Sequence, residues 1–281
     1  MKAIPFIKMQ GIGNDYVYID AINNRIPHPE ETAVKISDRH FGVGGDGLIL
    51  LLSSQKADFR MRMFNADGSE AEMCGNGIRC LAKMIYDHGF SEKKELAIET
   101  SAGIKEVSLE AKNKKVLKAT VDMGGPKIER GEIPMIGDPG TVIDEELELD
   151  DGVKFQITSV SMGNPHCVIF VEDVDNFPVS KYGPMIETHP LFPEKVNVEF
   201  VEILSAGEVR QRTWERGSGE TLACGTGASA VTVAGSLSRK LDRKVLVHLS
   251  GGDLNINWDV ITGNVYMTGE AVEVFRGEWY V

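Results

Sequence analysis

The sequence predicts an α+β protein of two pseudo-symmetric domains, each a strand-rich sheet wrapped around a central helix. One pattern occurs twice: a cysteine stands four residues after a glutamate and directly before Gly-x-Gly, at Cys74 and again at Cys224. The register between the copies persists, because Asn14 precedes Cys74 by 60 positions and Asn164 precedes Cys224 by 60. Self-similarity held over this length indicates a duplicated structural unit.

The first copy begins with residues 6–20, where alternating apolar residues around a glycine pair predict strand, turn and strand. Apolar residues at helical spacing predict a helix over residues 30–39, and alternation predicts a strand over residues 58–64. A helix follows Cys74, with an apolar face formed by Ile78, Leu81, Met84 and Ile85. Further strands are predicted at residues 96–100, 105–110 and 119–123.

The second copy starts after an acidic loop at residues 144–151, with strands predicted at residues 155–160, 208–212 and 245–249. Gly124-Gly125-Pro126 interrupts both helical and strand patterns and is the predicted linker. We therefore expect an N-terminal half over residues 1–123 and a C-terminal half over residues 124–269. The last run, residues 270–281, follows the second copy and is expected to return to the first half.

Composition excludes several classes of function. A formal net charge of −12 argues against a nucleic-acid-binding surface, which needs clustered Lys and Arg. No stretch approaches the roughly 20 apolar residues that span a bilayer, and the N-terminus lacks a secretory signal pattern, so we expect a cytoplasmic protein without membrane contact. The four cysteines match no zinc-ligand spacing, so no metal site is predicted. In a reducing compartment they should be free thiols, with Cys80 and Cys167 as small core residues.

Cys74 and Cys224 each stand in a glycine-rich loop at a predicted helix start. Backbone N–H groups there are unpaired, and they favour an anion and a thiolate. A helix terminus contributes about 0.3–2 kcal/mol, at most about one and a half pKa units, so we expect both thiols to be poised near neutrality. The glycines also let a substrate approach the amides, which would stabilise a carboxylate turning into an enediolate.

Two facing pseudo-symmetric domains would place Cys74 and Cys224 on opposite walls of one interdomain cleft, where ligand sites commonly lie. An acid and a base on opposite faces of a bound molecule suit the inversion of a stereocentre, with the pair sharing one protonation state. His166 and Glu215 are the candidate local bases that select the active state. The non-catalytic alternative is a redox pair whose disulfide switches the protein.

The sequence carries seven features of a known family: residues 11–15 (Gly-Ile-Gly-Asn-Asp), 65–69 (Asn-Ala-Asp-Gly-Ser), 73–79 (Met-Cys-Gly-Asn-Gly-Ile-Arg), 163–166 (Gly-Asn-Pro-His), Asn197, 215–217 (Glu-Arg-Gly) and 224–227 (Cys-Gly-Thr-Gly). With these motifs the chain resembles the diaminopimelate epimerases over nearly its whole length. That family consists of cofactor-independent isomerases of bacterial and plant lysine synthesis. The resemblance implies their two-domain fold, with the active site in the interdomain cleft.

The resemblance also implies a reaction, which interconverts LL- and meso-diaminopimelate without pyridoxal phosphate or another cofactor. Cys74 and Cys224 would be the two bases, with His166 and Glu215 assisting proton transfer. The carboxylate at the reacting carbon would be bound by the amides of Gly75, Asn76, Gly225 and Thr226. The remaining polar ends of the substrate would be held by Asn14, Asn65, Asn164, Asn197, Glu215 and Arg216. One departure is Gly47, which stands where some members carry a substrate-contacting glutamine.

Two rival functions remain open at this point. Another two-cysteine isomerase, such as a proline or hydroxyproline racemase, has no second amino-acid end to bind, so Arg216 and the asparagine set argue against it. A redox-sensing amino-acid-binding protein would use the cysteines for disulfide exchange instead. The expected partners are the small amino-acid substrate and a second copy of the chain in a homodimer.

Overall fold

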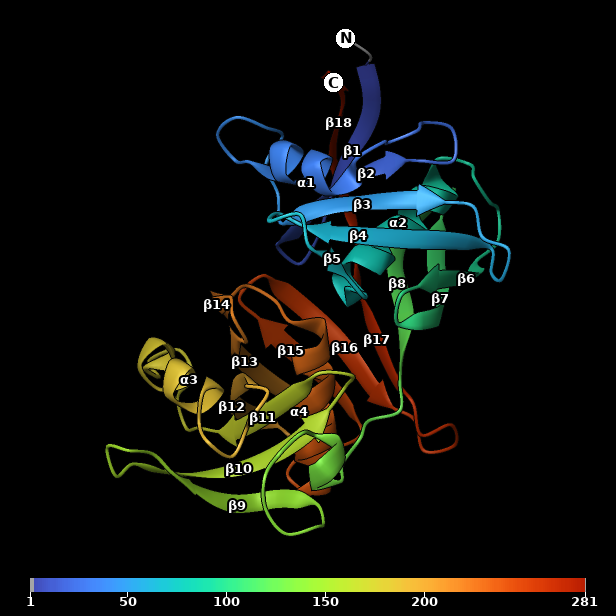
Figure 1. The fold of residues 1–281 in the computed structure, drawn as a ribbon. Coiled ribbons are helices and arrows are strands. Elements are labelled where there is room, and N and C mark those ends of the chain that lie inside the picture. The colour runs from blue at the N-terminus through green and yellow to red at the C-terminus, as the bar shows by residue number, and fades with distance from the viewer. Residues whose placement is uncertain (1–2, 281) are drawn as a thin grey trace. The chain divides into compact units, whose positions relative to one another are not determined.

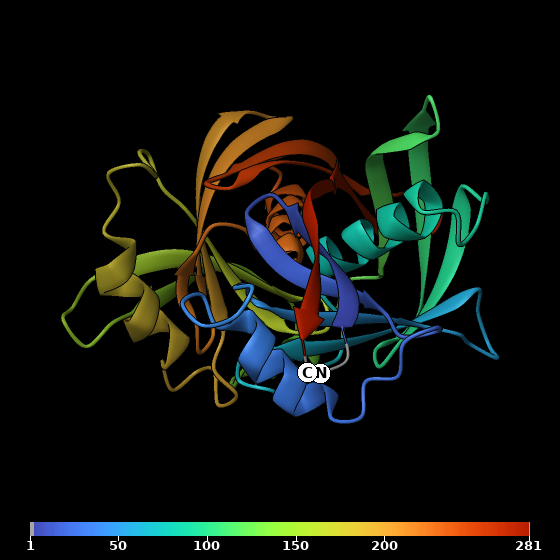
Figure 2. The ribbon, with the colours of Figure 1, turned by 90° about the horizontal axis from the view of Figure 1, so that it is seen from above.

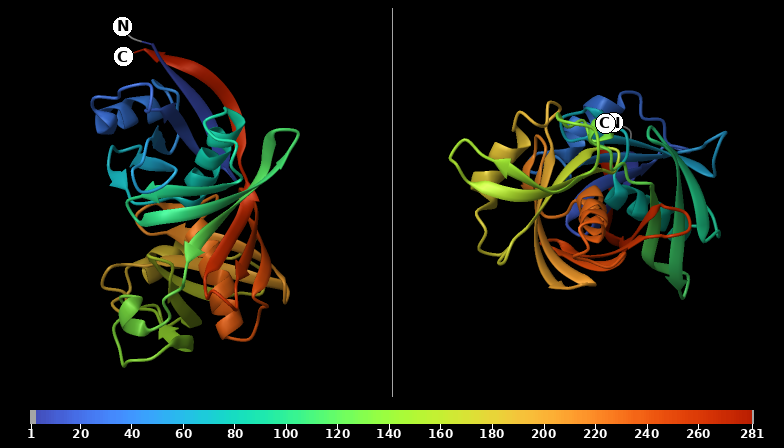
Figure 3. Two further views of the ribbon diagram at one scale, coloured as in Figure 1. Left: turned by 90° about the vertical axis from the view of Figure 1, so that its right-hand side faces the viewer. Right: turned by 90° about the horizontal axis from the view of Figure 1, so that it is seen from below.

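The computed structural model of the protein describes residues 3–280. The chain divides into two compact units, the first formed by Met1–Asp122 with Thr268–Val281 and the second by Met123–Met267. In each unit a mixed sheet curves around a helix that starts at a cysteine, α2 (Gly75–Asp87) in the first unit and α4 (Gly225–Leu237) in the second (Figure 1). Figure 3 shows the strands of the second unit surrounding α4. The predicted α+β class, with a helix at the centre of each copy, is confirmed.

The first unit alternates antiparallel and parallel strand pairs. β1 pairs antiparallel with β2, β2 pairs parallel with β3, and β4 pairs parallel with β6. β18 returns to pair antiparallel with β1, so the first and last strands of the chain lie side by side (Figure 2). The elements are β1 (Ala3–Gly11), β2 (Asn14–Asp20), α1 (Pro29–Ser37), β3 (Gly47–Leu52), β4 (Phe59–Asn65), β5 (Glu70–Ala71), β6 (Glu95–Thr100), β7 (Gly103–Lys112), β8 (Lys115–Gly124) and β18 (Val272–Tyr280).

The second unit repeats this pairing scheme. β10 pairs antiparallel with β11, β11 pairs parallel with β12, and β13 pairs parallel with β15. Registers match as well, because Tyr16 is opposite Gly47 in the first unit and His166 is opposite Asn197 in the second. The elements are η1 (Arg130–Glu132), β9 (Val142–Glu148), β10 (Lys154–Ser161), β11 (Pro165–Phe170), α3 (Val179–Glu187), β12 (Asn197–Ser205), β13 (Glu208–Glu215), β14 (Gly219–Thr221), β15 (Lys244–Leu249), β16 (Gly252–Trp258) and β17 (Val265–Glu270), which continues into the first unit.

The prediction did not include strands β12, β16 and β17, and two further elements run against their local residue preferences. The acidic run at residues 144–151, expected to be a loop, contributes most of β9, because Val142 and Leu147 point into the core while acidic side chains face outward. α3 was not predicted, since Gly183 and Pro184 in its middle disfavour a helix. Gly183 is needed there, because a Cβ would lie 2.5 Å from the Trp214 ring. Tertiary packing against the indole overrides the local preference.

Each unit has its own apolar core. In the second, Phe200 is fully buried and its ring lies 4.6 Å from that of Phe177. Cys80 and Cys167 are fully buried, as expected of core residues, and burial raises the pKa of Cys80 to about 11. Within residues 3–280, no helix is both long enough and apolar enough to cross a membrane.

Replacing Phe200 with alanine should lower the free energy of unfolding of the second unit by about 3–5 kcal/mol, because it removes a fully buried ring. Urea denaturation followed by circular dichroism measures the loss. Phe41→Ala is the matched control, since this ring is 91% exposed and its loss should change stability by no more than about 0.5 kcal/mol. Equal effects of the two changes would contradict the core assignment.

Candidate active site

The thiol of the first unit lies at the start of α2. Cys74 has extended backbone angles and caps the helix, with its Sγ accepting a hydrogen bond from the Gly77 N–H at 3.4 Å. Its thiol donates to Asn14 Oδ1 at 3.2 Å. Gly77 must be small, because a Cβ would lie 2.7 Å from Ile49 Cδ1. The motif glycine therefore allows the helix start to pack directly on strand β3.

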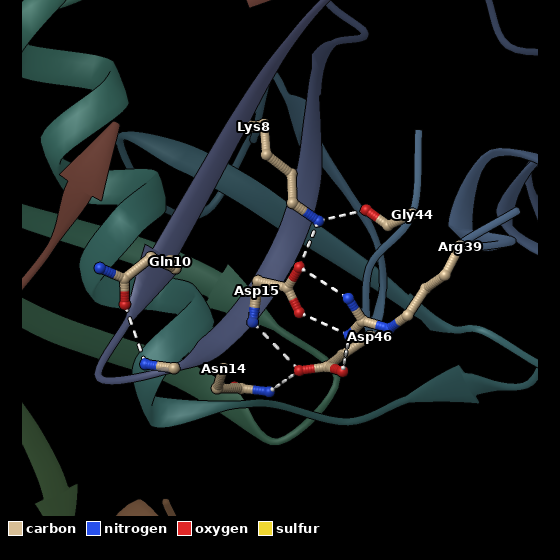
Figure 4. A network of polar contacts seen from close by, with 8 residues as sticks. Lys8, Gln10, Asn14, Asp15, Arg39, Gly44 and Asp46 are labelled. Carbon is tan, nitrogen blue, oxygen red and sulfur yellow. Dashed lines mark hydrogen bonds and ion pairs between the residues drawn. The ribbon is translucent and has the colours of Figure 1, made fainter. Parts of the chain in front are cut away.

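An ionic network anchors Asn14 (Figure 4). Asn14 Nδ2 donates to Asp46 Oδ2 at 2.7 Å, and the same oxygen accepts from the Asp15 N–H at 3.0 Å. Arg39 Nη2 bonds both carboxylates, at 2.8 Å to Asp15 Oδ1 and 3.0 Å to Asp46 Oδ1. Buried Lys8 pairs with Asp15 from the other side, at 2.5 Å. Sequence reasoning placed none of Lys8, Arg39 or Asp46 near the thiol.

Tyr16 was also missed. Its ring is 5% exposed; burial raises the pKa of its hydroxyl well above the usual range, and the neighbouring Cys74 raises it further. Its position in the repeat corresponds to His166, 150 positions later, and that correspondence could have identified it. Among the other predicted residues, Asn65 donates to Ser69 Oγ at 3.0 Å, and Asn76 is almost fully buried in the first turn of α2.

Gly47 is explained by close strand packing. A Cβ at this position would lie 2.1 Å from the carbonyl oxygen of Phe64 and 2.9 Å from the Tyr16 ring. The backbone here therefore accepts glycine alone without a shift, and no side chain reaches from this position. The corresponding position of the second unit is Asn197, which does carry a side chain.

The thiol of the second unit starts α4 in the same way. Cys224 stands at the N-cap position of α4 with extended backbone angles and is only 4% exposed. A chain of polar contacts runs from it into the core. Cys224 Sγ lies 3.5 Å from Thr226 Oγ1, which accepts from Asn164 Nδ2 at 3.3 Å. Asn164 Oδ1 lies 3.1 Å from His166 Nε2, and His166 Nδ1 lies 2.8 Å from Glu199 Oε1.

Glu199 is a residue that the sequence analysis did not find. It is fully buried with His166, and burial raises the pKa of its carboxyl while the charge of His166 opposes that rise. Within the described residues, its second oxygen has no hydrogen-bond partner. The sequence signal is an acidic residue at an inward position of a strand. The equivalent position of the first copy holds an apolar residue, Ile49.

Three further predicted residues lie together at the end of β13. Asn197 donates to the Pro165 carbonyl at 2.9 Å and accepts from the Arg216 N–H at 3.0 Å. Glu215 accepts from the Thr221 hydroxyl at 2.6 Å. The exposed Arg216 side chain bonds the Glu194 carbonyl at 2.8 Å through Nη1. Glu215 and Arg216 thus stand in the segment before Cys224, and the amide of Asn197 on β12 contacts the backbone of that segment.

The electrostatics of Cys224 differ from the expectation of a thiol poised near neutrality. Burial raises the pKa of Cys224 well above its ordinary value, and the carboxylates of Glu215 and Glu199 raise it further. Hydrogen bonds from Thr226 and the Gly227 N–H act in the opposite direction. The helix terminus is therefore outweighed by desolvation and two neighbouring negative charges, and Cys224 is a thiol in the free protein.

Each unit thus brings together a thiol, a helix N-terminus and an asparagine. The N–H groups of Gly75 and Asn76 in α2, and of Gly225 and Thr226 in α4, occupy first-turn positions where the helix itself offers no acceptor. Such positions bind carboxylates. The second unit adds His166 and Glu215 as titratable groups, so the arrangement can move a proton next to a bound carboxylate.

Comparison with known proteins gives a consistent result. Residues 6–129 and 158–274 match the family model described as diaminopimelate epimerase. The chain is 52% identical to the diaminopimelate epimerase of Methanococcus maripaludis, covering 97% of this chain and 98% of the relative. It is 53% identical to that of Desulfovibrio desulfuricans, covering 99% of each.

Solved structures with lower identity share the fold. A Bacillus anthracis phenazine biosynthesis protein of the PhzF family has a TM-score of 0.72 at 21% identity, covering 100% of both chains. A hydroxyproline epimerase from Agrobacterium vitis has a TM-score of 0.68 at 14% identity, covering 99% of this chain and 91% of that one. These structural similarities support the two-copy architecture of the fold.

Replacing Glu215 with glutamine should lower the pKa of Cys224, because it removes a negative charge that disfavours the thiolate. Ionisation of the thiol then begins at lower pH than in the parent protein. NMR of carbon-labelled cysteine in a Cys74→Ser background follows this titration. Glu220→Gln is the control, since Glu220 pairs with Arg212 and does not act on the thiol. An unchanged or higher titration midpoint in Glu215→Gln would contradict the charge assignment.

Proposed function

The chain belongs to the diaminopimelate epimerase family, and we propose that Cys74 and Cys224 are the two bases with which it inverts the α-carbon of diaminopimelate. The enzyme is an isomerase that interconverts LL- and meso-diaminopimelate. The observation that carries the proposal is the repetition of a thiol at a helix start, once in each unit. We take residues 1–123 with 270–281 and residues 124–269 as the functional halves, each supplying one base.

The substrate carboxylate next to the reacting carbon is assigned to the first-turn N–H groups of α2 and α4. Gly75, Asn76, Gly225 and Thr226 provide these donors. Removing the α-proton sends an electron pair into the carboxylate, which becomes an enediolate with more negative charge on oxygen. Fixed N–H dipoles stabilise that charge without reorganising, so they lower the barrier more than they stabilise the bound substrate.

The proton balance requires one thiolate and one thiol. The thiolate takes the α-proton as the Cα–H bond breaks, and the opposite thiol delivers its proton to the other face of the carbanion. The enzyme is left with the two protonation states exchanged, ready for the reverse reaction. No pyridoxal phosphate takes part in this scheme, because the enediolate itself holds the electron pair.

We assign the first deprotonation to Cys224, the thiol of the second unit. Cys224 is a thiol in the free protein, with Glu215 acting on it by charge and His166 connected to it through Asn164 and Thr226. We assign Glu215 and His166 as the groups that accept its proton when substrate binds. The ammonium group of the substrate then offsets the carboxylates that disfavour the thiolate.

The distal amino-acid end of diaminopimelate distinguishes it from shorter substrates. Arg216 provides a planar guanidinium suited to a bidentate carboxylate contact. Glu215 and the asparagine amides supply acceptors and donors for the remaining groups. We assign this role to Asn14, Asn65, Asn164, Asn197, Glu215 and Arg216. A proline or hydroxyproline racemase has no such second end to recognise.

Reduced protein incubated with diaminopimelate in deuterated water should incorporate deuterium at the α-carbon, and proline should not be labelled. Cys74→Ser and Cys224→Ser should each slow epimerisation by about 10²–10⁴-fold, the usual contribution of a general acid or base. Cys80→Ala is the control, since this thiol is buried in the core. Mass spectrometry reads the label. Absence of exchange in folded, fully reduced protein would falsify the proposal.

The reaction is placed in the cytoplasm, as a step in lysine and peptidoglycan precursor biosynthesis. None of the four cysteines forms a disulfide in the described residues, and the scheme needs Cys74 and Cys224 reduced. A reducing compartment provides that state. Fractionation of cells carrying the tagged protein tests this placement.

We also propose that the enzyme is a homodimer. Val272, Val274 and Phe275 on β18 are 39%, 55% and 45% exposed, so three apolar side chains of this strand stand on the surface of the first unit. Such surfaces commonly mark contacts between protein chains. Light scattering should give twice the chain mass of 30.8 kDa, and Val274→Glu should shift the protein toward the single-chain mass. A parent protein that is monomeric at micromolar concentration contradicts this assembly.

A further inference from the structure

Asp46 stands between α1 and β3 and belongs to none of the groups assigned above. Its carboxylate contacts the amide of Asn14 (Figure 4). That amide in turn contacts the thiol of Cys74. The two distances are 2.7 Å for Asn14 Nδ2 to Asp46 Oδ2 and 3.2 Å for Cys74 Sγ to Asn14 Oδ1. A carboxylate is therefore linked to a catalytic thiol through one intervening side chain.

The chemistry of the carboxylate decides which way the amide points. An ionised carboxyl group accepts hydrogen bonds and donates none, so Asn14 must present its NH₂ group to Asp46. The amide oxygen then faces Cys74 and accepts the thiol proton. Reversing the amide would set its oxygen against the carboxylate, losing that contact, and would turn its NH₂ group to the sulfur of Cys74.

Asp46 is itself held at several points. Its N–H donates to the Asp15 carbonyl at 2.7 Å, and its carbonyl accepts from the Ala66 N–H at 3.0 Å. Arg39 bonds its second carboxylate oxygen at 3.0 Å. Because the backbone and both oxygens are fixed, Asp46 provides a rigid acceptor for the amide rather than a mobile surface charge.

The second unit has no carboxylate at the position of Asp46. The position that corresponds to Asp46 is Val196, which is fully buried. There the amide of Asn164 turns its oxygen to His166 Nε2, at 3.1 Å, and its NH₂ to the Thr226 hydroxyl, at 3.3 Å. The two equivalent asparagines are therefore oriented by different partners, and only Asn14 offers its oxygen to a thiol among the contacts of the described residues.

We propose that Asp46 is a positioning residue that fixes the amide of Asn14, so that its oxygen keeps Cys74 in the thiol form until substrate arrives. This inference rests on the proposed two-base function, in which Cys74 is the proton donor while Cys224 becomes the thiolate. An oxygen acceptor stabilises a thiol and repels a thiolate, whereas an NH₂ group would do the opposite. The duplicated site thereby acquires one acid side and one base side.

Other titratable groups lie near Cys74, and each variant at Asp46, Asp15 or Arg39 changes only one of them. They come from strand β2 and helix α2, and the ionic network adds the rest. The groups are Tyr16, Tyr18, Arg79, Cys80, Lys8, Asp15, Arg39 and Asp46.

The test measures the pH dependence of Cys74 alkylation by iodoacetamide in a Cys224→Ser background. Cys80 and Cys167 are fully buried and do not compete in the folded protein. Asp46→Ala releases the Asn14 amide, whose NH₂ can then turn to the sulfur. The alkylation midpoint should fall by about one pH unit, the equivalent of one hydrogen bond. Asp46→Glu retains a carboxylate acceptor and should restore part of the shift.

Two control variants in the same network separate the effect of a lost charge from the effect of the Asn14 amide orientation. Asp15→Asn removes one negative charge but leaves Asp46 on the amide, so its midpoint should move less than that of Asp46→Ala. Arg39→Met removes an exposed cation that touches both carboxylates, and it should keep Cys74 in the thiol form. Thermal melting confirms that each variant is folded. Equal shifts in Asp15→Asn and Asp46→Ala overturn the positioning role.

Turnover gives the second readout. With Cys224 intact, Asp46→Ala should lower kcat/KM for diaminopimelate by about 10- to 100-fold, the range for losing a hydrogen bond to a charged group. Lys56→Met changes an exposed cation outside this network and should stay near the parent value. An Asp46→Ala enzyme with parent activity and parent alkylation midpoint rejects the inference. Because alkylation needs no epimerase activity, failure of the proposed function in the parent protein is recognised separately.

Discussion

Both half-sites depend on the start of a helix that is enclosed by a curved sheet. At Cys74 and at Cys224 the chain leaves an extended conformation and enters α2 or α4, whose first-turn N–H groups have no acceptor within the helix backbone. A glycine three residues after Cys74 allows this turn to pack on a strand, since a Cβ at Gly77 would lie 2.7 Å from Ile49 Cδ1. A side chain there would force the end of the Ile49 side chain to shift.

The same scaffold has produced two different electrostatic environments. Tyr16 and His166 occupy equivalent positions, as do Asp46 and Val196, and Ile49 and Glu199. The first unit keeps its charges in an ionic network beside a loop, whereas the second buries a histidine and a carboxylate in its core. Equal backbone geometry with unequal charges suits a reaction in which one thiol must give a proton while the other takes one.

The duplicated fold was accessible from the sequence because strand and helix periodicity repeat in register, and the repeat placed Asn14 and Cys74 in one unit. β9 and α3 escaped prediction for specific reasons. The acidic residues of β9 resemble a loop although Leu147 packs inward, and Gly183 in α3 is required by the Trp214 ring rather than by local preference. In both cases a long-range contact decides the local conformation.

The sequence by itself determined the two thiols, their helix starts and the motifs of the family, since these are local patterns of residue type and spacing. Only the tertiary structure decided how each thiol is tuned. Glu199 and Asp46 lie far from the cysteines in the chain, and strand pairing brings them to the sites. The raised pKa of Cys224 follows from burial, which depends on every segment packed around it and on the charges of Glu215 and Glu199. Desolvation and long-range charge are properties of the folded chain, so no local pattern could have revealed them.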